Sequence, residues 1–304
     1  MRIVFFGTPD FAVPTLDALS ATHELTLVVA QPDKPSGRGM RMQAPPVAER
    51  SRALGLNLEQ PARIRDASFL ERVRSAQPDL GVVIAYGKIL PAALLTIPRH
   101  GFLNVHGSRL PKYRGAAPVQ RAIERGETST ALTIMRVDEE LDHGPILAIE
   151  DLAIGPDERS PSVFARMSGI GAGLLVRTIA ALEAGSVKEV PQNHDEATIA
   201  AKIDKSEGLL DWSESSETIY NRFRAFDPWP GVSAGGWKLV EIERVEGEGR
   251  VGEILRIGEQ GVDVAAASGA IRLISIQRPG KSRVSAVELA RGSSWQLGTM
   301  LAPP

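Results

Sequence analysis

The chain places an amide and an imidazole two residues apart, at Asn104 and His106, where an apolar run ends. In an extended strand this spacing projects both side chains onto one face. When an amine attacks a carbonyl carbon, negative charge builds on the oxygen, and an asparagine NH2 can stabilise that oxyanion. Histidine can take the proton that the amine loses, because its ordinary pKa lies nearest to neutral pH. Asp142, thirty-six residues after His106, could orient the imidazole and stabilise its cation. The combination predicts acyl transfer without a covalent intermediate.

Each of these residues alone has a plainer interpretation. An Asn or His at a strand end is more often a satisfied turn or core residue, and an Asp before His-Gly is often a turn former. Only the combination favours chemistry. In the same segment, Arg114 is a candidate anchor for a substrate phosphate or carboxylate, and Gly115 would let the backbone turn tightly.

The elements that must position these side chains follow from apolar runs that alternate with helix-capable segments up to about Glu150. This alternation predicts an α/β domain with a doubly wound sheet of parallel strands, in which ligands bind beyond the carboxyl ends of the strands. Asn104, His106 and the Tyr86-Gly87 turn would lie there. We expect strands at 3–6, 25–30, 80–84 and 102–106, helices at 11–20, 46–54, 67–75 and 91–95, and a long helix over 161–184.

Beyond Asp204 the pattern changes to short segments separated by glycines. Such spacing predicts a small β-barrel or sandwich. The expected elements are a helix over 216–225 and strands at 237–245, 251–257, 262–266 and 271–276.

The first strand ends in Gly7-Thr8-Pro9-Asp10 and lacks the G-x-G-x-x-G pattern. Because the glycines that let a backbone approach a pyrophosphate are missing, a nicotinamide dinucleotide is not expected.

The composition is that of an ordinary globular protein, with 43% hydrophobic residues in 304, which is enough for two cores. The absence of cysteine excludes disulfides, thiolate catalysis and cysteine metal sites. The five histidines show no close pairing, so no metal is expected. We find neither a secretory signal nor an apolar run near the roughly 18 residues of a membrane span. A cytoplasmic protein without membrane contact is therefore expected.

The formal net charge of −2 gives no global sign of nucleic-acid binding, so such a contact would need local basic clusters. The first candidate, KPSGRGMR over 34–41, is rich in Pro, Gly and Ser and is not expected to form a helix or strand. The second, over 272–291, has a turn at Pro279-Gly280 that would gather basic side chains around a loop. A solvated surface loop or hairpin is the plainer interpretation of each.

The segment NVHGSRLPKYRGAAP, followed by LDHGPIL, closely resembles the formyl-transfer signature of the folate-dependent formyltransferases. The chain resembles members that act on methionyl-tRNA over essentially all 304 residues. The further matching segments, in the same order, are IVFFGTPDFAVPTLDAL, QPDKPSGRGMRMQAPPV, PDLGVVIAYGKILP, KIDKSEGLLDW, FRAFDPWPG and IQRPGKSRVSAVEL.

This resemblance implies a Rossmann-like catalytic domain over 1–189, a linker over 190–208 and a smaller OB-like β-barrel over 209–304 that binds tRNA. It also implies transfer of the formyl group of 10-formyltetrahydrofolate to the α-amino group of methionine on initiator tRNA. Asn104 would stabilise the oxyanion, His106 would handle the proton and Asp142 would hold His106. A monomer is expected.

The resemblance further assigns binding residues. The pterin of the folate donor would lie near the backbone of one segment, with a second segment also lining the site: Val83, Ile84, Ala85 and Tyr86, then Ser108, Arg109, Leu110 and Pro111. The loop at 34–41 would reach the tRNA acceptor stem, with Arg38 most involved. The full set of expected tRNA contacts is Lys34, Arg38, Arg41, Lys205, Arg278, Lys281 and Arg283.

Four positions depart from the family pattern. Met40-Arg41 stands where a second pair of basic residues is usual, and Arg109 replaces a usual Leu, so only its backbone contact carries over. Next to Asp142, Glu140 replaces Gly and His143 replaces Thr.

Two alternatives remain open on the sequence. The same signature serves formyltransferases that act on glycinamide ribonucleotide or on amino sugars attached to nucleotides. The chain could also be a noncatalytic RNA-binding module that kept the fold, which the intact Asn104, His106 and Asp142 argue against.

Overall fold

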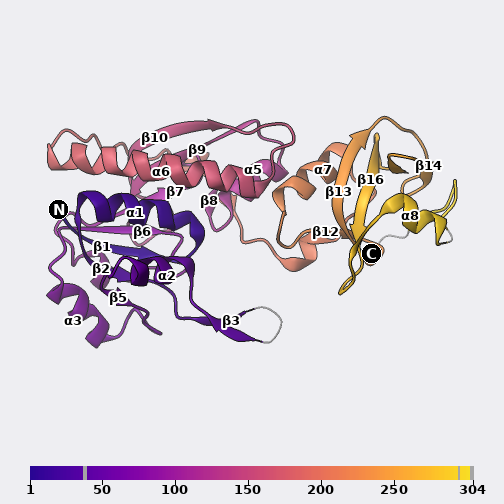
Figure 1. Cartoon of the computed structure of the whole chain (residues 1–304). Helices are drawn as coiled ribbons and strands as arrows, with labels where there is room; N and C mark the ends of the chain where they lie inside the picture. Colours follow the sequence, from indigo (N-terminus) through magenta and orange to yellow (C-terminus); the bar gives the residue numbers. More distant parts are fainter. Residues whose placement is uncertain (37–39, 294, 302–304) are drawn as a thin grey trace. The chain divides into compact units, whose positions relative to one another are not determined.

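The computed structural model describes residues 1–36, 40–293 and 295–301 (Figure 1). Contacts divide the chain into two compact units. The first comprises Met1–Pro118, Ser129–Ala153 and Phe164–Ala200, and the second comprises Val119–Thr128, Ile154–Val163 and Ala201–Pro304. The division into 1–189, 190–208 and 209–304 stays a prediction.

The first unit is built on a seven-stranded sheet in the order β10-β9-β7-β6-β1-β2-β5. The five strands from β7 to β5 are parallel, and β9 and β10 are antiparallel to their neighbours. The strands are β1 Arg2–Gly7, β2 Glu24–Val29, β5 Leu58–Glu59, β6 Leu80–Ile84, β7 Phe102–His106, β9 Ser129–Arg136 and β10 Ile146–Ala153. The predicted α/β class with a largely parallel sheet is confirmed.

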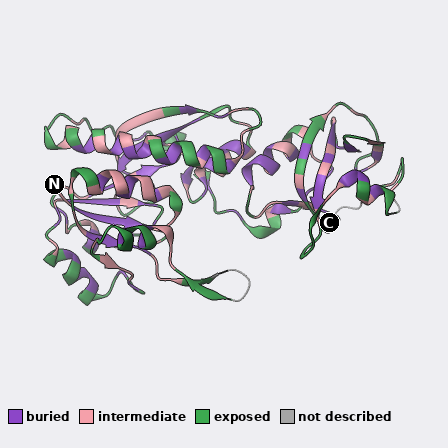
Figure 2. Cartoon of the chain, viewed as in Figure 1, coloured by how far each residue is buried: buried purple, intermediate pink, exposed green. Residues whose placement is uncertain are grey.

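Helices cover both faces of this sheet, which explains why its parallel strands are largely apolar. Figure 1 shows α1 and α6 on one side of the strands and α3 on the other. All five residues from Ile3 to Gly7 are buried (Figure 2). The helices of this unit are α1 Val13–Thr22, preceded by the 3-10 turn η1 Asp10–Ala12, then α2 Pro46–Ala53, α3 Ala67–Ser75, α4 Ala92–Leu95 and α6 Ser160–Glu183, whose first four residues belong to the second unit.

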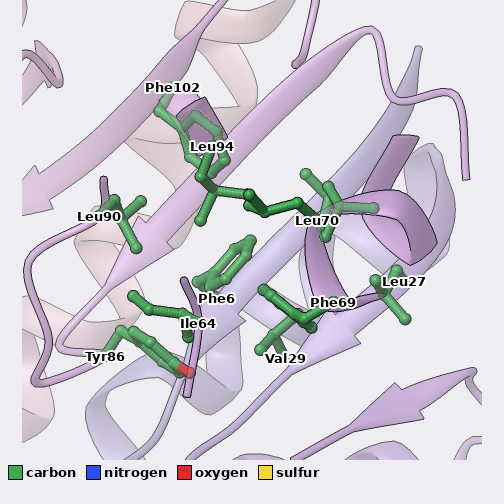
Figure 3. Close-up of a cluster of buried hydrophobic side chains, with 12 residues drawn as sticks. Phe6, Leu27, Val29, Ile64, Phe69, Leu70, Tyr86, Leu90, Leu94 and Phe102 are labelled. Atoms are coloured by element: carbon green, nitrogen blue, oxygen red, sulfur yellow. The ribbon is translucent and has the colours of Figure 1, made fainter. Parts of the chain in front are cut away.

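One face carries a cluster of buried aromatic and aliphatic side chains (Figure 3). Phe6 lies at its centre, with ring centroids 5.2 Å from Tyr86 and 5.6 Å from Phe102 in edge-to-face geometry. Phe69 of α3 packs edge-on against the same ring. The cluster therefore ties β1, β6 and β7 to α3, and sets the positions of strand ends beyond it.

On the other face, α6 approaches β7 closely. A Cβ atom on Gly171 would lie 3.0 Å from Val105, so glycine permits the contact. Because side chains alternate along a strand, Asn104 and His106 must then point to the face opposite α6. By length and composition alone, α6 is also apolar enough to cross a membrane, but half of its most apolar window is buried inside the protein, as in a core helix.

Two expectations for this unit were incomplete or wrong. The β9–β10 pair was not predicted; its direct connection makes it antiparallel. The 34–41 segment was expected to lack strands, but β3 Lys34–Ser36 pairs with β4 Arg41–Gln43. Composition misled because the residues that flank 37–39 pair with each other. Residues 37–39, including Arg38, lie outside the described residues.

The second unit contains a six-stranded sheet in the order β12-β13-β16-β15-β14, with β17 also paired to β16. All these pairs are antiparallel, as expected for a separate β domain. The strands are β12 Val232–Ala234, β13 Trp237–Val245, β14 Ile254–Gly258, β15 Gly261–Ala265, β16 Ala270–Gln277 and β17 Arg283–Ser285. The predicted bounds of β13 are confirmed, and those of β14 to β16 differ by one to three residues.

Helices and short turns complete this unit. The predicted bounds of α7, Ser216–Ala225, are confirmed, and Ser215 caps the helix by accepting from the Thr218 N–H. Helix α8, Ala286–Arg291, was not predicted within the basic stretch over 272–291. The remaining elements of the chain are α5 Pro118–Glu124, β8 Arg114–Gly115, β11 Ile199–Ala200, η2 His194–Glu196 and η3 Lys205–Gly208.

The Tyr86 hydroxyl is buried without a hydrogen-bond partner in the part of the chain that the structure describes. Burial raises the pKa of Tyr86 to about 12. This folded-state pKa lies above the unfolded value near 10, so the resulting stability is present below pH 10 and is lost as pH rises toward 12. Between pH 8 and pH 11 the wild type should lose about 1 kcal/mol more free energy of unfolding than Tyr86→Phe.

Urea unfolding of both proteins at the two pH values measures this difference. Tyr220→Phe is the matched control: the pKa of Tyr220 is also raised to about 12, but its hydroxyl donates to Asp157. At pH 8, Tyr220→Phe should therefore lower stability, and Tyr86→Phe should not. If the wild type and Tyr86→Phe lost the same free energy of unfolding between pH 8 and pH 11, the raised pKa of Tyr86 would be contradicted.

Candidate active site

Strand β7 brings the predicted amide and imidazole to one edge of the first unit. Asn104 pairs in register with Val83 of β6 on one side and with Met135 of β9 on the other. His106 ends the strand and is only 5% exposed, whereas Asn104 is half-buried. The spacing of two therefore does place both side chains on one face at a carboxyl strand end, where α/β sheets bind ligands.

The loop between β9 and β10 brings Asp142 to both of them. Its Oδ1 lies 3.4 Å from Asn104 Nδ2, and its Oδ2 lies 3.6 Å from His106 Nδ1. The Gly115 N–H donates to the same Oδ2 at 2.8 Å. The backbone of Asp142 has φ of 49°, a left-handed conformation that residues other than glycine seldom adopt. Groups from two segments, β7 and β8, thus meet around the carboxylate of Asp142.

The imidazole is held by a backbone carbonyl. His106 Nε2 lies 2.9 Å from Tyr113 O. Because a carbonyl oxygen can only accept, Nε2 carries the hydrogen, and Nδ1 is left as the basic nitrogen. The distance of 3.6 Å from Nδ1 to Asp142 is longer than a normal hydrogen bond, and the expected role of Asp142 in orienting the ring stays a prediction. Its charge can still stabilise a protonated imidazole.

The turn that supplies this carbonyl depends on a short parallel pair. Strand β8 pairs with β11, with Arg114 opposite Ile199 and Gly115 opposite Ala200. Gly115 has φ of 118°, and a Cβ atom there would lie 2.8 Å from the Ala200 carbonyl oxygen. Glycine is therefore required here both by conformation and by space.

The guanidinium of Arg114 is held by partners within the chain. It is 8% exposed, and its guanidinium donates to Gln192 Oε1 from Nε at 3.2 Å and from Nη2 at 2.7 Å. Nη2 also lies 2.8 Å from His194 Nδ1, which must accept because a guanidinium only donates. The prediction of a substrate anchor was wrong, because the guanidinium is itself buried and its Nε and Nη2 donors are taken up by Gln192 and His194.

The two unusual residues near Asp142 make their own contacts. The ring of His143 stacks on that of His194 with centroids 4.0 Å apart and planes at 3°. His143 Nδ1 lies 2.8 Å from Asp138 Oδ2, and its Nε2 lies 4.0 Å from Glu140. The histidine that replaces the usual threonine is thus fixed from two sides.

The first expected folate segment lies beside Asn104. Val83 pairs with Asn104, Ile84 is buried, and Ala85 is exposed with φ of 46°. The Tyr86 carbonyl accepts from Thr8 Oγ1 at 3.2 Å and from Gln31 at 3.1 Å, while its side chain is in the core. The sheet order reverses between β1 and β6, and ligands bind beside such a reversal in doubly wound folds.

The second expected folate segment follows β7. Ser108 is buried; its carbonyl accepts from Thr133 Oγ1 at 2.6 Å, and its hydroxyl donates to the Lys112 carbonyl at 2.6 Å. Leu110 is buried, and its N–H lies 3.4 Å from the same threonine hydroxyl. The exposed Arg109 side chain forms an ion pair with Asp151. Pro111 is half-buried, and its carbonyl accepts from the Thr198 N–H.

The expected tRNA contacts that the structure describes are exposed. In the first unit, Lys34 and Arg41 lie on the paired strands β3 and β4. In the second unit they are Lys205 on η3, Lys281 and Arg283, and Arg278, whose guanidinium stacks 4.3 Å over the Trp237 ring.

The predicted turn between β16 and β17 is confirmed. The Lys281 N–H donates to the Arg278 carbonyl at 3.1 Å, and Gly280 has φ of 71°. Among the described residues, no group of acidic and histidine side chains has the geometry to hold a metal ion.

Comparison with known proteins places this site in a family. The family model described as formyl transferase matches residues 1–179, and that described as formyl transferase, C-terminal domain, matches residues 202–294. The chain belongs to the formyl transferase family.

Three similar relatives carry the name methionyl-tRNA formyltransferase. The chain is 46% identical to methionyl-tRNA formyltransferase of Thermus thermophilus over 99% of both chains. It is 42% identical to that of Myxococcus xanthus, over 96% of this chain and 95% of the relative. For Deinococcus radiodurans the identity is 43%, over 98% and 94%.

Solved structures share the fold at lower identity. One is an N-formyltransferase from Helicobacter canadensis in complex with folinic acid and dTDP-3-aminofucose, with a TM-score of 0.70, 15% identity, and coverage of 90% of this chain and 98% of that one. Another is HypX from Aquifex aeolicus in complex with tetrahydrofolic acid, with a TM-score of 0.63, 18% identity, and coverage of 95% and 47%.

Replacing Gly115 by Ala should lower the free energy of unfolding by about 3 kcal/mol, because the left-handed backbone and the Ala200 carbonyl both oppose a Cβ atom. It should also slow formyl transfer at least tenfold, since the Gly115 N–H would no longer reach Asp142.

Gly185→Ala is the matched control, because φ there is +67° and a Cβ atom would meet nothing within 4 Å. It should lower stability by only about 1 kcal/mol and leave the rate unchanged. Urea unfolding and transfer rates measure both effects. Equal stability losses in the two variants would contradict the close approach at Ala200.

Proposed function

We propose that the chain transfers the formyl group of 10-formyltetrahydrofolate to the α-amino group of methionine carried by initiator tRNA. The observation that carries the proposal is that Asn104 and His106 both lie next to the carboxylate of Asp142. The methionyl-tRNA formyltransferases similar to this chain over nearly its full length support the choice of acceptor. Two solved structures of the same fold, in complex with folinic acid and with tetrahydrofolic acid, support the donor.

The chemistry divides among the three residues. The amine attacks the formyl carbon, and the carbonyl oxygen gains negative charge that the Asn104 amide N–H stabilises. One N–H of that amide points to Asp142 at 3.4 Å, which leaves the other for the oxyanion. Because Nε2 of His106 is engaged by Tyr113, Nδ1 accepts the proton that the amine loses.

Asp142 acts on the proton step through its charge. The imidazolium formed at His106 lies 3.6 Å from Asp142 Oδ2, in a site where both side chains are largely buried. A carboxylate at that distance favours the protonated ring. The proton is then delivered to the folate nitrogen that leaves the formyl carbon, so the amine loses one proton and the departing amine gains one.

The donor site is proposed where the two folate segments lie. The exposed backbone of Ala85 follows β6, whose Val83 pairs with Asn104, so a group bound there lies beside the oxyanion donor. Ser108 to Pro111 follow the same strand as His106. The proposed tRNA contacts are the exposed basic residues Lys34, Arg41, Lys205, Arg278, Lys281 and Arg283. Cytoplasmic location and a monomeric state stay predictions.

Asn104→Ala should lower the rate of formyl transfer by about 10²–10³, because one oxyanion donor is lost. The measurement is single-turnover transfer from 10-formyltetrahydrofolate to charged initiator methionyl-tRNA. Charged elongator methionyl-tRNA and an amino-sugar nucleotide serve as parallel acceptors for the wild type, and rapid formylation of the initiator alone is expected.

Full turnover by Asn104→Ala would overturn its role. Turnover of the sugar, with neither tRNA accepted, would keep the catalytic residues and replace the acceptor. Binding of tRNA without any formyl transfer would favour the noncatalytic alternative. Asn57→Ala, at an exposed position of the first unit, is the control for the substitution itself.

Removing the charges of Arg278, Lys281 and Arg283 together should weaken tRNA binding and flatten its dependence on salt. Each lost phosphate contact reduces the slope of log K against log salt by about 0.7–0.9. The control replaces three other exposed basic residues of the first unit, Arg63, Arg65 and Lys188. Binding titrations over a range of salt concentrations measure the slopes. Equal slopes for the hairpin variant and the wild type would remove these residues from the tRNA surface.

A further inference from the structure

We infer that Gln192 is a positioning residue for the reaction, which holds Asp142 in the place where its carboxylate reaches both Asn104 and His106. The rate measurements that test this inference rest on the proposed function, whereas the hydrogen-exchange measurement does not. Gln192 lies in the polar segment that the sequence assigned to a linker, and it is 6% exposed. A buried amide in such a segment requires an explanation, since its four hydrogen-bonding positions must be satisfied.

The amide of Gln192 makes four hydrogen bonds. Nε2 donates to the Asp142 carbonyl at 2.9 Å and to the Gly144 carbonyl at 2.8 Å. Oε1 accepts from Nε and Nη2 of the buried Arg114 at 3.2 and 2.7 Å. Both hydrogens and both lone pairs are used, so the orientation of the amide is fixed. The two donated bonds grip the backbone of the loop that carries the catalytic carboxylate.

The loop needs this support for a physical reason. Asp142 has φ of 49°, a conformation that is unfavourable for a residue with a Cβ atom and that persists only where the surroundings impose it. A Cβ atom on Gly144 would lie 2.3 Å from the Arg136 carbonyl oxygen, so the loop also passes close to its own strand. Gln192 bonds the carbonyls on both sides of the turn.

The segment that carries Gln192 is anchored to the first unit. Val190 and Ile146 exchange two backbone hydrogen bonds at 2.8 Å. In an antiparallel pair, the residue two positions after Val190 lies opposite the residue two positions before Ile146. This register places Gln192 opposite Gly144, in agreement with their hydrogen bond.

Arg114 joins the two supports of Asp142. It bonds Gln192 through its side chain, and the next residue, Gly115, donates its N–H to the Asp142 carboxylate at 2.8 Å. Gln192, Arg114 and Gly115 are therefore linked to one another and together hold both the backbone and the carboxylate of Asp142.

Hydrogen exchange of the free protein tests the inference without any substrate. The Gly115 N–H reports on the Asp142 carboxylate, to which it donates, whereas the Ala116 N–H donates to the Ala200 carbonyl at 3.0 Å. In Gln192→Ala, exchange at Gly115 should accelerate at least tenfold while exchange at Ala116 stays unchanged. Equal acceleration at both amides would mean that the whole segment opens, and no change at Gly115 would mean that Gln192 does not hold Asp142; either result overturns the inference.

Single-turnover formyl transfer tests the consequence for the reaction. Gln192→Ala should lower kcat about 10- to 100-fold with KM for both substrates changed less than about twofold, because misplaced groups affect the transition state. In an Asp142→Asn background the same substitution should lower kcat by less than about twofold. Additive losses would show that Gln192 does not act through Asp142 and would overturn the inference.

Two variants guard against loss of folding. Gln192→Glu keeps the size and the contact with Arg114 but faces two carbonyl oxygens without hydrogens, so it should lower kcat as Gln192→Ala does. Gln60→Ala is the matched control, because Gln60 also donates to a backbone carbonyl, that of Gln31, and accepts from an arginine, Arg52. It should lose comparable stability and keep kcat. A kcat of Gln192→Glu equal to that of the wild type would overturn the inference. If the wild type transferred no formyl group but Gln192→Ala showed the expected hydrogen exchange, the proposed reaction would be refuted and the inference about Asp142 would stand.

Discussion

The arrangement of the candidate active site depends on where the carboxylate of Asp142 lies. One oxygen lies 3.4 Å from the Asn104 amide, and the other lies 3.6 Å from His106 and accepts from the Gly115 N–H. A charged group that is 14% exposed is costly to hold without such partners. The carboxylate therefore couples the group that would stabilise the oxyanion to the group that would move the proton. A shift of about 1 Å in its position would affect both at once.

The fold provides this position through register and close approach. Phe102 packs in the aromatic cluster around Phe6, and Val105 contacts α6, which fixes the rotation of β7 about its own axis. Side-chain alternation then sets the direction of Asn104 and His106. The left-handed backbones of Asp142 and of the Tyr113 turn lie beside the site, as strained residues often do where function requires a fixed geometry.

The sequence predicted Asn104 and His106 because they lie two residues apart in one strand, and Asp142 because it could supply the carboxylate that such a pair would use. Helix α7 and strand β13 were predicted to the residue, since local capping and apolar patterns determine them. Contacts that are distant in the chain were not predictable. The Tyr113 carbonyl has no side-chain signature, and Gln192 lies in a segment whose polar composition is typical of linkers. Arg114 was assigned to a substrate because the side chains that accept from its guanidinium come from residues about eighty positions later.

The most direct measurement of the central claim is the single-turnover rate of formyl transfer to charged initiator methionyl-tRNA by Asp142→Asn. The asparagine keeps the size of the side chain and an oxygen that can accept from Gly115, but it removes the charge beside His106. The account predicts a rate about 10²–10⁴ lower, with the affinities for tRNA and the folate donor retained. A rate within about twofold of the wild type would show that the carboxylate charge does not couple the oxyanion and proton steps.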